Sequence, residues 1–412
     1  MKIAVVGAGI SGLGASIIVG TKHEVHLYES ESRLGGHAHT VDLQTAVGPV
    51  SADVGFLVYN ELNYPQLTAF FKYLGVDTVN SDMSLSIQSA GGFEWAGNNI
   101  NSVFGQRSNL FRPSFYSMLW DILRFHREAK NNLELSRRHA WSLGELLRER
   151  KFSLNFSDNY LLPMGAAIWS TPEDKMLEYP ADTFLQFFIN HKLLQVAGRP
   201  QWKTVKGGSR HYVEKAKQKI AHLHLGEAVL AVENLGSEVL LSTKLGSEKF
   251  DKVILATHAP TSLSLLKNPK GAERELLNAF QVEKNRSSLH QDKALMPRRK
   301  RCWASWNAFA SKQGPAVLTY FLNQLQPLGT EDHYFLTLNP NRKISGELAN
   351  FSYDHPRFTR EAIRMQRALK SIQGISNIYY AGAWTGYGFH EDGLSSAVRV
   401  GELLDCGAPW IV

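Results

Sequence analysis

The chain has 412 residues, of which 43% are hydrophobic, 11% aromatic and 20% charged. This composition is typical of a folded globular protein, and it excludes a disordered chain, a collagen or a coiled coil as the main description. The formal net charge is +7 at pH 7. Because the charges are spread evenly along the chain, we expect no nucleic-acid partner.

The cysteine and apolar patterns exclude further classes. The only cysteines, Cys302 and Cys406, are far apart and have no CxxC spacing, so we expect neither a disulfide framework nor a metal site. The apolar N-terminal run soon reaches glycine and lacks the long apolar segment of a signal peptide. No stretch approaches 18 uninterrupted apolar residues. We therefore expect a cytoplasmic protein.

The first thirty residues predict a βαβ unit. Residues 2–6 form a short β-branched run that is typical of a buried parallel strand. A GxGxxG motif follows at once, and residues 13–19 continue it as an apolar helix. A second predicted strand over residues 24–28 ends at Glu29.

Each part of this motif has a physical role in binding a dinucleotide. Gly7 allows the tight turn, Gly9 lets a pyrophosphate approach the backbone, and Gly12 lets the helix pack close to the strand. The N–H groups at the start of the helix, including those of Ile10 and Ser11, point toward the pyrophosphate. Since Glu29 lies twenty-two residues after Gly7, it can accept hydrogen bonds from the adenosine ribose.

A second glycine pair directly follows the ribose acid. In this stretch the chain resembles the flavin-containing amine oxidase superfamily, in which an acid, a short spacer and a Gly-Gly pair line the FAD. The resemblance implies that FAD is the cofactor. It also implies that this stretch contacts FAD through Ser30, Arg33, Gly35, Gly36 and His37.

Two later segments carry the same resemblance. Residues 206–210 look like the central glycine pair of the superfamily, and Val229 lies on the strand whose backbone meets the adenine. Residues 378–402 look like the C-terminal strand and helix that reach the flavin, where Asp392 is expected to cap the helix. The cofactor residues implied by these segments are Gly207, Gly208, Val229, Gly382, Asp392, Gly393 and Leu394.

The most similar group is narrower than the superfamily. The segments 37–40, 53–56, 160–171, 201–210 and 386–393 look like those of bacterial predicted NAD/FAD-binding oxidoreductases. That group is associated with cyclopropane and branched fatty-acyl enzymes. The resemblance therefore implies a lipid-like substrate.

Three positions depart from the superfamily pattern. His37 stands where many members have arginine after the glycine pair, so Arg33 or the backbone alone is left to meet the pyrophosphate. Ala383 and Trp384 follow Gly382 where an acid is usual. The segment 286–290 offers no lysine for the water-holding position of amine oxidases, which weakens amine oxidation as the activity.

The resemblance implies an α/β fold, with a Rossmann-like FAD-binding domain of discontinuous segments and an α+β substrate domain. We assign residues 1–60, 201–260 and 366–412 to the first domain. Residues 61–200 and 261–365 form the second.

Two helices and a basic run are predicted within the substrate domain. Residues 113–126 and 185–194 have helical apolar spacing, which favours core-facing helices; for 113–126 the alternative is a face toward acyl chains or a membrane. The basic run 297–301 is either a solvated surface or a contact with anionic headgroups. Peripheral membrane contact therefore stays open.

The C-terminal motif supplies the catalytic candidates, Tyr387, His390 and Glu391, because it has to pass the isoalloxazine before its helix begins. His390 or Glu391 can move a proton while the flavin takes hydride. The alternative is that both simply hold the loop by hydrogen bonds.

The resulting prediction is an FAD-dependent oxidoreductase that desaturates, isomerises or oxidises an apolar, fatty-acyl or phospholipid substrate. The alternatives are a flavin amine or amino-acid oxidase, and a flavoprotein that binds lipid or a partner without turnover of its own. Because a second nucleotide fingerprint is absent from the sequence, we expect oxygen, a quinone or a partner protein as electron acceptor.

Overall fold

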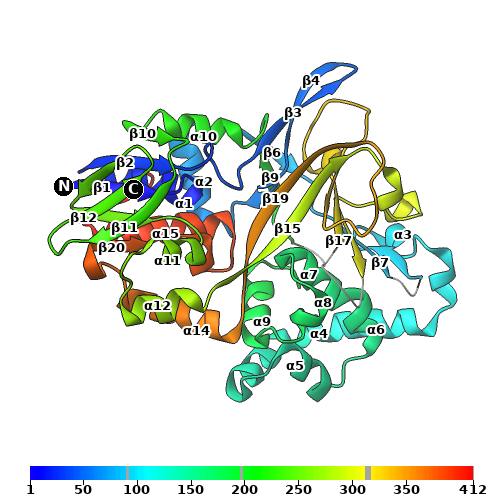
Figure 1. The fold of residues 1–412 in the computed structure, drawn as a ribbon. Helices are drawn as coiled ribbons and strands as arrows, with labels where there is room; N and C mark the ends of the chain where they lie inside the picture. Colours follow the sequence, from blue (N-terminus) through cyan, green and yellow to red (C-terminus); the bar gives the residue numbers. More distant parts are fainter. Residues whose placement is uncertain (90–91, 195–197, 311–316, 412) are drawn as a thin grey trace.

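The computed structural model describes residues 1–412 except 90–91, 195–197, 311–316 and 412, and Figure 1 shows the fold. A five-stranded parallel sheet stands at one end of the molecule, with the order β10-β2-β1-β14-β20. Its strands are β1 (Lys2–Val6), β2 (Glu24–Glu29), β10 (His222–Leu225), β14 (Lys252–Leu255) and β20 (Ile378–Tyr380). The predicted Rossmann-like domain of discontinuous segments is confirmed.

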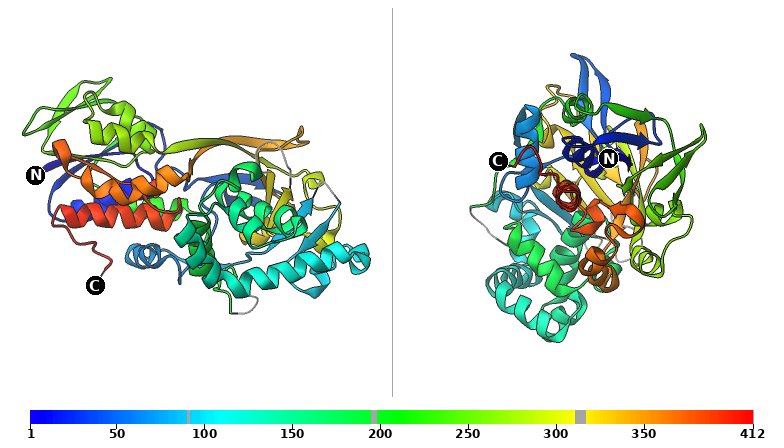
Figure 2. Two further views of the ribbon diagram at one scale, coloured as in Figure 1. Left: turned by 90° about the horizontal axis from the view of Figure 1, so that it is seen from below. Right: turned by 90° about the vertical axis from the view of Figure 1, so that its left-hand side faces the viewer.

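Both faces of this sheet are buried, as a continuous apolar strand requires. Along β1, Ile3 and Val5 belong to one hydrophobic core, and Ala4 and Val6 belong to another. The first core is covered by α1 (Ile10–Val19) and α15 (His390–Leu403), which pack side by side (Figures 1 and 2). The second is covered by elements described below.

Glycines set the spacing of α1 and α15. A Cβ atom at Gly14 would lie 2.6 Å from Leu394 Cδ1, and one at Gly401 would lie 2.4 Å from Ile18 Cγ2. At Gly393 a Cβ atom would meet Ile10 and Ser11, each at 2.8 Å. The two helices therefore touch through backbone, which brings their N-terminal ends to one side of the sheet.

The predicted roles of Gly7 and Gly12 are visible in the βαβ unit. Gly7 has a φ of +97° in the turn that leaves β1, a conformation that side chains disfavour. A Cβ atom at Gly12 would lie 1.7 Å from the carbonyl oxygen of Gly7. The helix thus packs on the turn at a distance that only glycine allows.

The opposite face of the sheet is covered by a three-stranded antiparallel sheet and three helices. These are β11 (Val229–Asn234), β12 (Val239–Thr243), β13 (Ser247–Phe250), α11 (Ala259–Leu265), α12 (Gly271–Asn278) and α14 (Arg360–Ala368). Leu277 of α12 and Met365 of α14 share a core with Leu255 of the parallel sheet.

The second half of the molecule is built on a seven-stranded mixed sheet. Its order is β19-β15-β18-β17-β16-β7-β8, and its neighbours are antiparallel except for β7 and β16. The strands are β7 (Leu85–Ser89), β8 (Glu94–Ala96), β15 (Gln281–His290), β16 (Trp306–Ala310), β17 (Val317–Phe321), β18 (Phe335–Leu338) and β19 (Glu347–Arg357).

Helices from the middle of the chain pack into one core with this sheet. They are α3 (Ile100–Val103), α4 (Pro113–His139), α5 (Leu143–Glu149), α6 (Leu154–Phe156), α7 (Leu162–Trp169), α8 (Glu173–Met176), α9 (Ala181–Asn190) and α13 (Leu322–Leu325). This half matches the predicted α+β class. Within the described residues, no helix has the length and apolar character needed to cross a membrane.

Short elements connect the two halves. They are β3 (Thr40–Thr45), β4 (Gly48–Asp53), β5 (Tyr59–Asn60), α2 (Pro65–Leu74), β6 (Thr78–Ser81), β9 (Trp202–Val205) and α10 (Arg210–Lys217). We propose the two predicted domains with changed boundaries. The helices α2, α11, α12 and α14 are assigned to the domain of the parallel sheet, because they pack into its cores.

The three predicted helices exist with shifted ends. The first begins at Ile10 rather than Leu13, because its glycine-rich start is already helical. The helix predicted over 113–126 continues to His139, and its later turns bury Ala129 and Leu133. The helix predicted over 185–194 is α9, which begins at Ala181 after Pro180 and ends at Asn190.

We predict that Gly12→Ala destabilises the fold by about 1–3 kcal/mol or more, because the added methyl group overlaps the Gly7 carbonyl oxygen. Gly271→Ala is the matched control, since a Cβ atom there has no neighbour within 4 Å. Urea denaturation of the three apoproteins measures the difference. Equal stability of the two variants would contradict this account of the motif.

Candidate functional site

One cavity of about 510 Å³ runs between the two halves of the molecule. It is lined at one end by the glycine-rich loop after β1 and at the other by β16, β17 and the helices of the second half. The predicted site residues that line it are Gly7, Gly9, Ile10, Ser11, Glu29, Ser30, Gly35, Gly36, His37, Val229, Gly382, Tyr387 and His390. Segments far apart in the sequence thus share one site.

The glycine-rich end has the form of an anion cradle. A Cβ atom at Gly9 would meet no described residue within 4 Å, so the backbone is open to the cavity at this point. Within the described part of the chain no side chain caps the N-terminus of α1, whose first N–H groups face the same space. The Gly35 N–H donates to the Ala8 carbonyl oxygen at 2.9 Å, which fixes the second glycine pair against the first motif.

Glu29 lines the cavity in this region, whereas Arg33 does not. One carboxylate oxygen of Glu29 accepts from the Ala8 N–H at 2.8 Å, and the other accepts from the Glu31 N–H at 2.9 Å. Glu29 lines the cavity at the end of β2. Arg33 instead donates to the Gly36 carbonyl oxygen at 2.8 Å and lies outside the lining. The sequence left either Arg33 or the backbone to meet the pyrophosphate. In the structure it is the backbone, not Arg33, that faces the cavity.

The glycine pair Gly207 and Gly208 lies away from this cavity and lines a separate one of about 260 Å³. The next residue, Ser209, donates from its N–H and its hydroxyl to the buried Asp53 carboxylate. Gly208 allows this contact, since a Cβ atom there would lie 2.4 Å from Thr40 Cγ2. Burial raises the pKa of Asp53 to about 6. The pair therefore joins α10 to the β3–β4 hairpin.

The predicted residues at the start of α15 also lie behind the cavity wall. Asp392 accepts from the Phe389 N–H at 2.9 Å and so stabilises the first turn, as expected, but from position N3 rather than from the N-cap. Gly393 and Leu394 pack against residues of α1. Gly12, another predicted cofactor residue, also has a packing role, against the turn after β1. None of Asp392, Gly393 and Leu394 is among the described residues that line the cavity, and the structure gives them a supporting position.

Glu391 faces the opposite way from His390. Its carboxylate accepts from the N–H groups of Gln66 and Leu67, each at 2.9 Å. These groups belong to the N-terminal turn of α2, where a carboxylate is stabilised by the helix dipole. The position agrees with the alternative role of Glu391 as a residue that holds the loop.

The loop before α15 passes along the cavity. Tyr387, Phe389 and His390 line it. The His390 ring stacks on Phe56 with centroids 3.9 Å apart, and its Nε2 lies 3.1 Å from the Tyr212 hydroxyl. Burial lowers the pKa of His390 to about 3, so this ring is neutral at pH 7.

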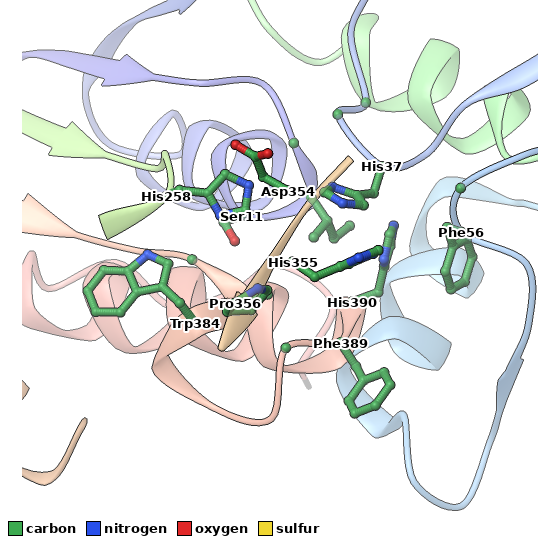
Figure 3. Close-up of a pocket in the computed structure, with 18 of the residues that line it drawn as sticks. Ser11, His37, Phe56, His258, Asp354, His355, Pro356, Trp384, Phe389 and His390 are labelled. Carbon is green, nitrogen blue, oxygen red and sulfur yellow. The ribbon is translucent and has the colours of Figure 1, made fainter. Parts of the chain in front are cut away.

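Four histidines surround this part of the cavity: His37, His258, His355 and His390. Figure 3 shows the rings of His37, His355 and His390 gathered together, with Asp354 near His258. Burial lowers the pKa of all four, to about 4 for His355. His37 Nε2 is buried and has no hydrogen-bond partner among the described residues. The group therefore offers neutral donors and acceptors rather than positive charge.

The tautomer of His355 is fixed by a chain of amides. The Arg286 N–H donates to Asn339 Oδ1 at 3.1 Å, so the amide nitrogen of Asn339 faces and donates to Asn285 Oδ1 at 2.6 Å.

The amide nitrogen of Asn285 then donates to the Glu283 carbonyl oxygen at 3.1 Å, and it lies 2.9 Å from His355 Nδ1. Nδ1 has to be an acceptor here, and a neutral ring carries its proton on the other nitrogen. His355 therefore presents an Nε2–H group on the ring edge away from β15.

Sequence reasoning missed His355 and Asp354 altogether. They lie on β19, which reaches the site only because it pairs with β15 along its whole length. No linear motif surrounds them, so only strand pairing could have revealed them. Trp169 and Trp202 also line the cavity, and Trp169 is only 5% exposed.

One further cluster of polar rings lies at the edge of the parallel sheet. Ligand atoms of Glu24, His26 and His222 lie within 4.8 Å of one another. The His26 and His222 rings are stacked at 4.4 Å with planes 8° apart. An imidazole binds a metal in its own plane, and two stacked rings cannot both do so at one ion without turning. We therefore propose no metal site here.

Comparisons with known proteins place the fold. Residues 5–74 match the family model of the NAD(P)-binding Rossmann-like domain. No curated protein matches the chain. Among solved structures, the putative protoporphyrinogen oxidase from Exiguobacterium sp. 255-15 is 17% identical with a TM-score of 0.68, and the match covers 98% of each chain.

Two other similar structures have different activities in their names. The CLA-producing fatty acid isomerase from P. acnes is 12% identical with a TM-score of 0.71, covering 98% of this chain and 97% of the other. Putrescine oxidase bound to putrescine is 14% identical with a TM-score of 0.71, covering 98% and 99%. The expected resemblance to flavin-containing amine oxidases is confirmed at the level of the fold.

We predict that His355 is neutral at pH 7 with its proton on Nε2. Nitrogen NMR of imidazole-labelled protein reports the protonation of each ring nitrogen, and His355→Gln assigns the signals. Asn285→Asp should move the proton to Nδ1, because a carboxylate can only accept. Asn350→Asp is the control on the same sheet, since Asn350 bonds Arg286 and Ser288 rather than His355. A wild-type proton on Nδ1 would refute the assignment.

Proposed function

We propose that this protein is an FAD-dependent oxidoreductase that acts on an apolar fatty-acyl chain. The observation that carries the proposal is the single cavity, which joins the glycine-rich cradle to a chamber walled by large apolar side chains. Among the apolar residues of that chamber are Met83, Ile168, Trp169, Phe187, Leu193, Trp202, Trp306, Tyr320 and Phe358.

The residues of the cradle fit FAD. The open backbone at Gly9 and the uncapped N-terminus of α1 suit a pyrophosphate, and Glu29 suits a ribose. Val229 would lie beside the adenine. When bound, FAD supplies a hydride acceptor for the oxidation of a C–H bond.

The histidines would supply uncharged hydrogen-bonding groups at the reacting end. The Nε2–H of His355 would be a hydrogen-bond donor without charge, because burial keeps the ring neutral. His390 lines the same space and is held by Phe56 and Tyr212. The surrounding aromatic walls exclude water, which protects a hydride transfer from side reactions.

The charges of the lining favour an esterified acyl chain over a free acid. None of the described residues that line the cavity is lysine or arginine, and burial lowers the pKa of each of its histidines, which keeps them neutral at pH 7. A buried carboxylate would find no cation there, at a cost of several kcal/mol. An acyl chain whose ester and headgroup stay outside the chamber avoids this cost. We infer a phospholipid or another acyl ester as substrate.

The lack of a lysine among the described residues of the lining weighs against amine oxidation. Lys284, the only lysine of β15, is exposed and lies outside the lining. The position that holds a water in amine oxidases therefore has no lysine in this cavity. The fold it shares with putrescine oxidase keeps an amine substrate as a comparison in the test below.

We predict that Gly9→Ala folds normally but binds FAD at least about tenfold more weakly, because its methyl group would occupy the space left for the pyrophosphate. Gly407→Ala is the matched control, since a Cβ atom there also has no neighbour within 4 Å. Fluorescence titration of the apoproteins with FAD measures the affinity. Unchanged binding by Gly9→Ala would place the cofactor elsewhere.

The substrate class is tested by anaerobic absorbance titration of the flavin-loaded protein. We expect unsaturated or methyl-branched acyl phospholipids to bleach the flavin spectrum, and a panel of amines to leave it unchanged. Free fatty acids should act more weakly than their esters, because the chamber offers a carboxylate no cation.

Each other outcome has a distinct meaning. Bleaching by an amine would overturn the acyl substrate and favour an amine oxidase. A shift of the flavin spectrum without bleaching, together with an altered acyl chain by mass spectrometry, would establish a redox-neutral isomerisation. A protein that cannot be loaded with FAD would overturn the cofactor. Reoxidation by oxygen or a quinone then identifies the acceptor.

A further inference from the structure

Seven large apolar side chains are exposed together at the end of the molecule opposite the parallel sheet. They lie on α3, on the 3-10 helix η1 (Arg107–Phe111), on the first half of α4 and at the start of α6 (Figures 1 and 2). We call this set the α4 patch. It consists of Ile100, Leu110, Phe111, Tyr116, Trp120, Leu123 and Leu154. Phe111 is 86% exposed and Trp120 is 63% exposed.

The helix α4 is apolar on two sides, and the structure accounts for only one. Phe115, Met118 and Phe125 are buried in the core of the second half. Tyr116 and Trp120 lie on the solvent side, one turn apart. An ordinary surface helix would carry polar residues there. One side of the predicted helix is therefore core-facing, and the opposite side is apolar but exposed.

Contacts between the elements hold the patch as one surface. The Tyr116 hydroxyl donates to the Leu110 carbonyl oxygen at 3.1 Å, which joins α4 to η1. The Ser153 N–H donates to the Asp121 carboxylate at 2.8 Å, which sets Leu154 beside α4. These two bonds tie η1 and the start of α6 to α4, so the elements that carry the patch are held together.

The charge around the α4 patch is positive. Between residues 98 and 127 the only acid is Asp121, which is buried and paired with Arg124 at 3.0 Å. Arg107 is exposed, and the contacts of its guanidinium with Asn101 and Phe104 are all to neutral oxygens. Exposed Lys151 follows α5, and exposed Lys300 and Arg301 lie on the turn that packs against α3. The predicted basic run 297–301 therefore borders the apolar surface.

We propose that the α4 patch docks this protein on the surface of an anionic lipid bilayer. Aromatic side chains flanked by arginine and lysine are the groups that favour the boundary between headgroups and acyl chains. Each basic residue adds attraction to anionic lipids. Since docking is a property of this outer surface, it is independent of the proposed reaction in the cavity.

The positive charge around the α4 patch favours an anionic bilayer over a second copy of the chain as its occupant. In a symmetric dimer the same patch would face itself, and its arginines and lysines would face like charges. A bilayer with anionic headgroups instead complements the positive border.

The test is co-flotation of the full-length protein with vesicles of phosphatidylcholine alone or with 30% phosphatidylglycerol. We expect binding to the anionic vesicles that weakens as salt is raised. The double variant Phe111→Ser, Trp120→Ser should bind at least about tenfold more weakly, because it removes the two most exposed rings of the patch. Leu245→Ser is the matched control. Leu245 is 84% exposed but lies on the β12–β13 turn, which is not part of the patch.

Three results would overturn the proposal. The first is equal binding of wild type and the double variant. The second is equal binding to both kinds of vesicle. The third is a wild-type dimer by light scattering that becomes monomeric in the double variant without any vesicle binding, which would assign the patch to a second copy. FAD binding and denaturation midpoints of the variants should match those of wild type. Failure of the docking proposal can then be distinguished from failure of the proposed flavin function.

Discussion

The close contact of α1 with the turn after β1 is the constraint on which the site depends. Gly12 sits so near the Gly7 carbonyl oxygen that no side chain fits between them. This contact directs the N-terminal N–H groups of α1 into the cavity and leaves the backbone open at Gly9. The contact of α1 with α15 through Gly393 then fixes where the loop of Tyr387 and His390 crosses the same cavity.

Burial determines the chemistry at the other end of the cavity. Four histidines in a small space would repel one another if charged, and their removal from water lowers the pKa of each. The site is therefore rich in hydrogen-bonding groups and poor in positive charge. Such a lining suits a reaction in which hydride and proton move without a buried ionic substrate. The amides of Asn285 and Asn339 also determine the hydrogen bonding of the site, because they decide which nitrogen of His355 carries the proton.

Two motifs that looked like site residues serve the packing of the molecule. Gly207 and Gly208 connect α10 to the Asp53 carboxylate, and Glu391 accepts hydrogen bonds from the first turn of α2. A glycine pair has the same sequence whether it faces a cofactor or a neighbouring strand. Likewise, adjacent residues at a helix start point in different directions, so His390 lines the cavity while Glu391 turns to another helix.

The sequence by itself determined the βαβ unit and the cradle at Gly7, Gly9 and Glu29. These features are local, since a turn, a helix start and a strand end depend on neighbouring residues. Only the tertiary structure decided that β19 brings His355 and Asp354 to the site, that Arg33 bonds its own loop, and that α4 exposes Trp120. The reason is physical: strand pairing, the direction of a side chain and the covered side of an amphipathic helix are set by contacts between distant segments.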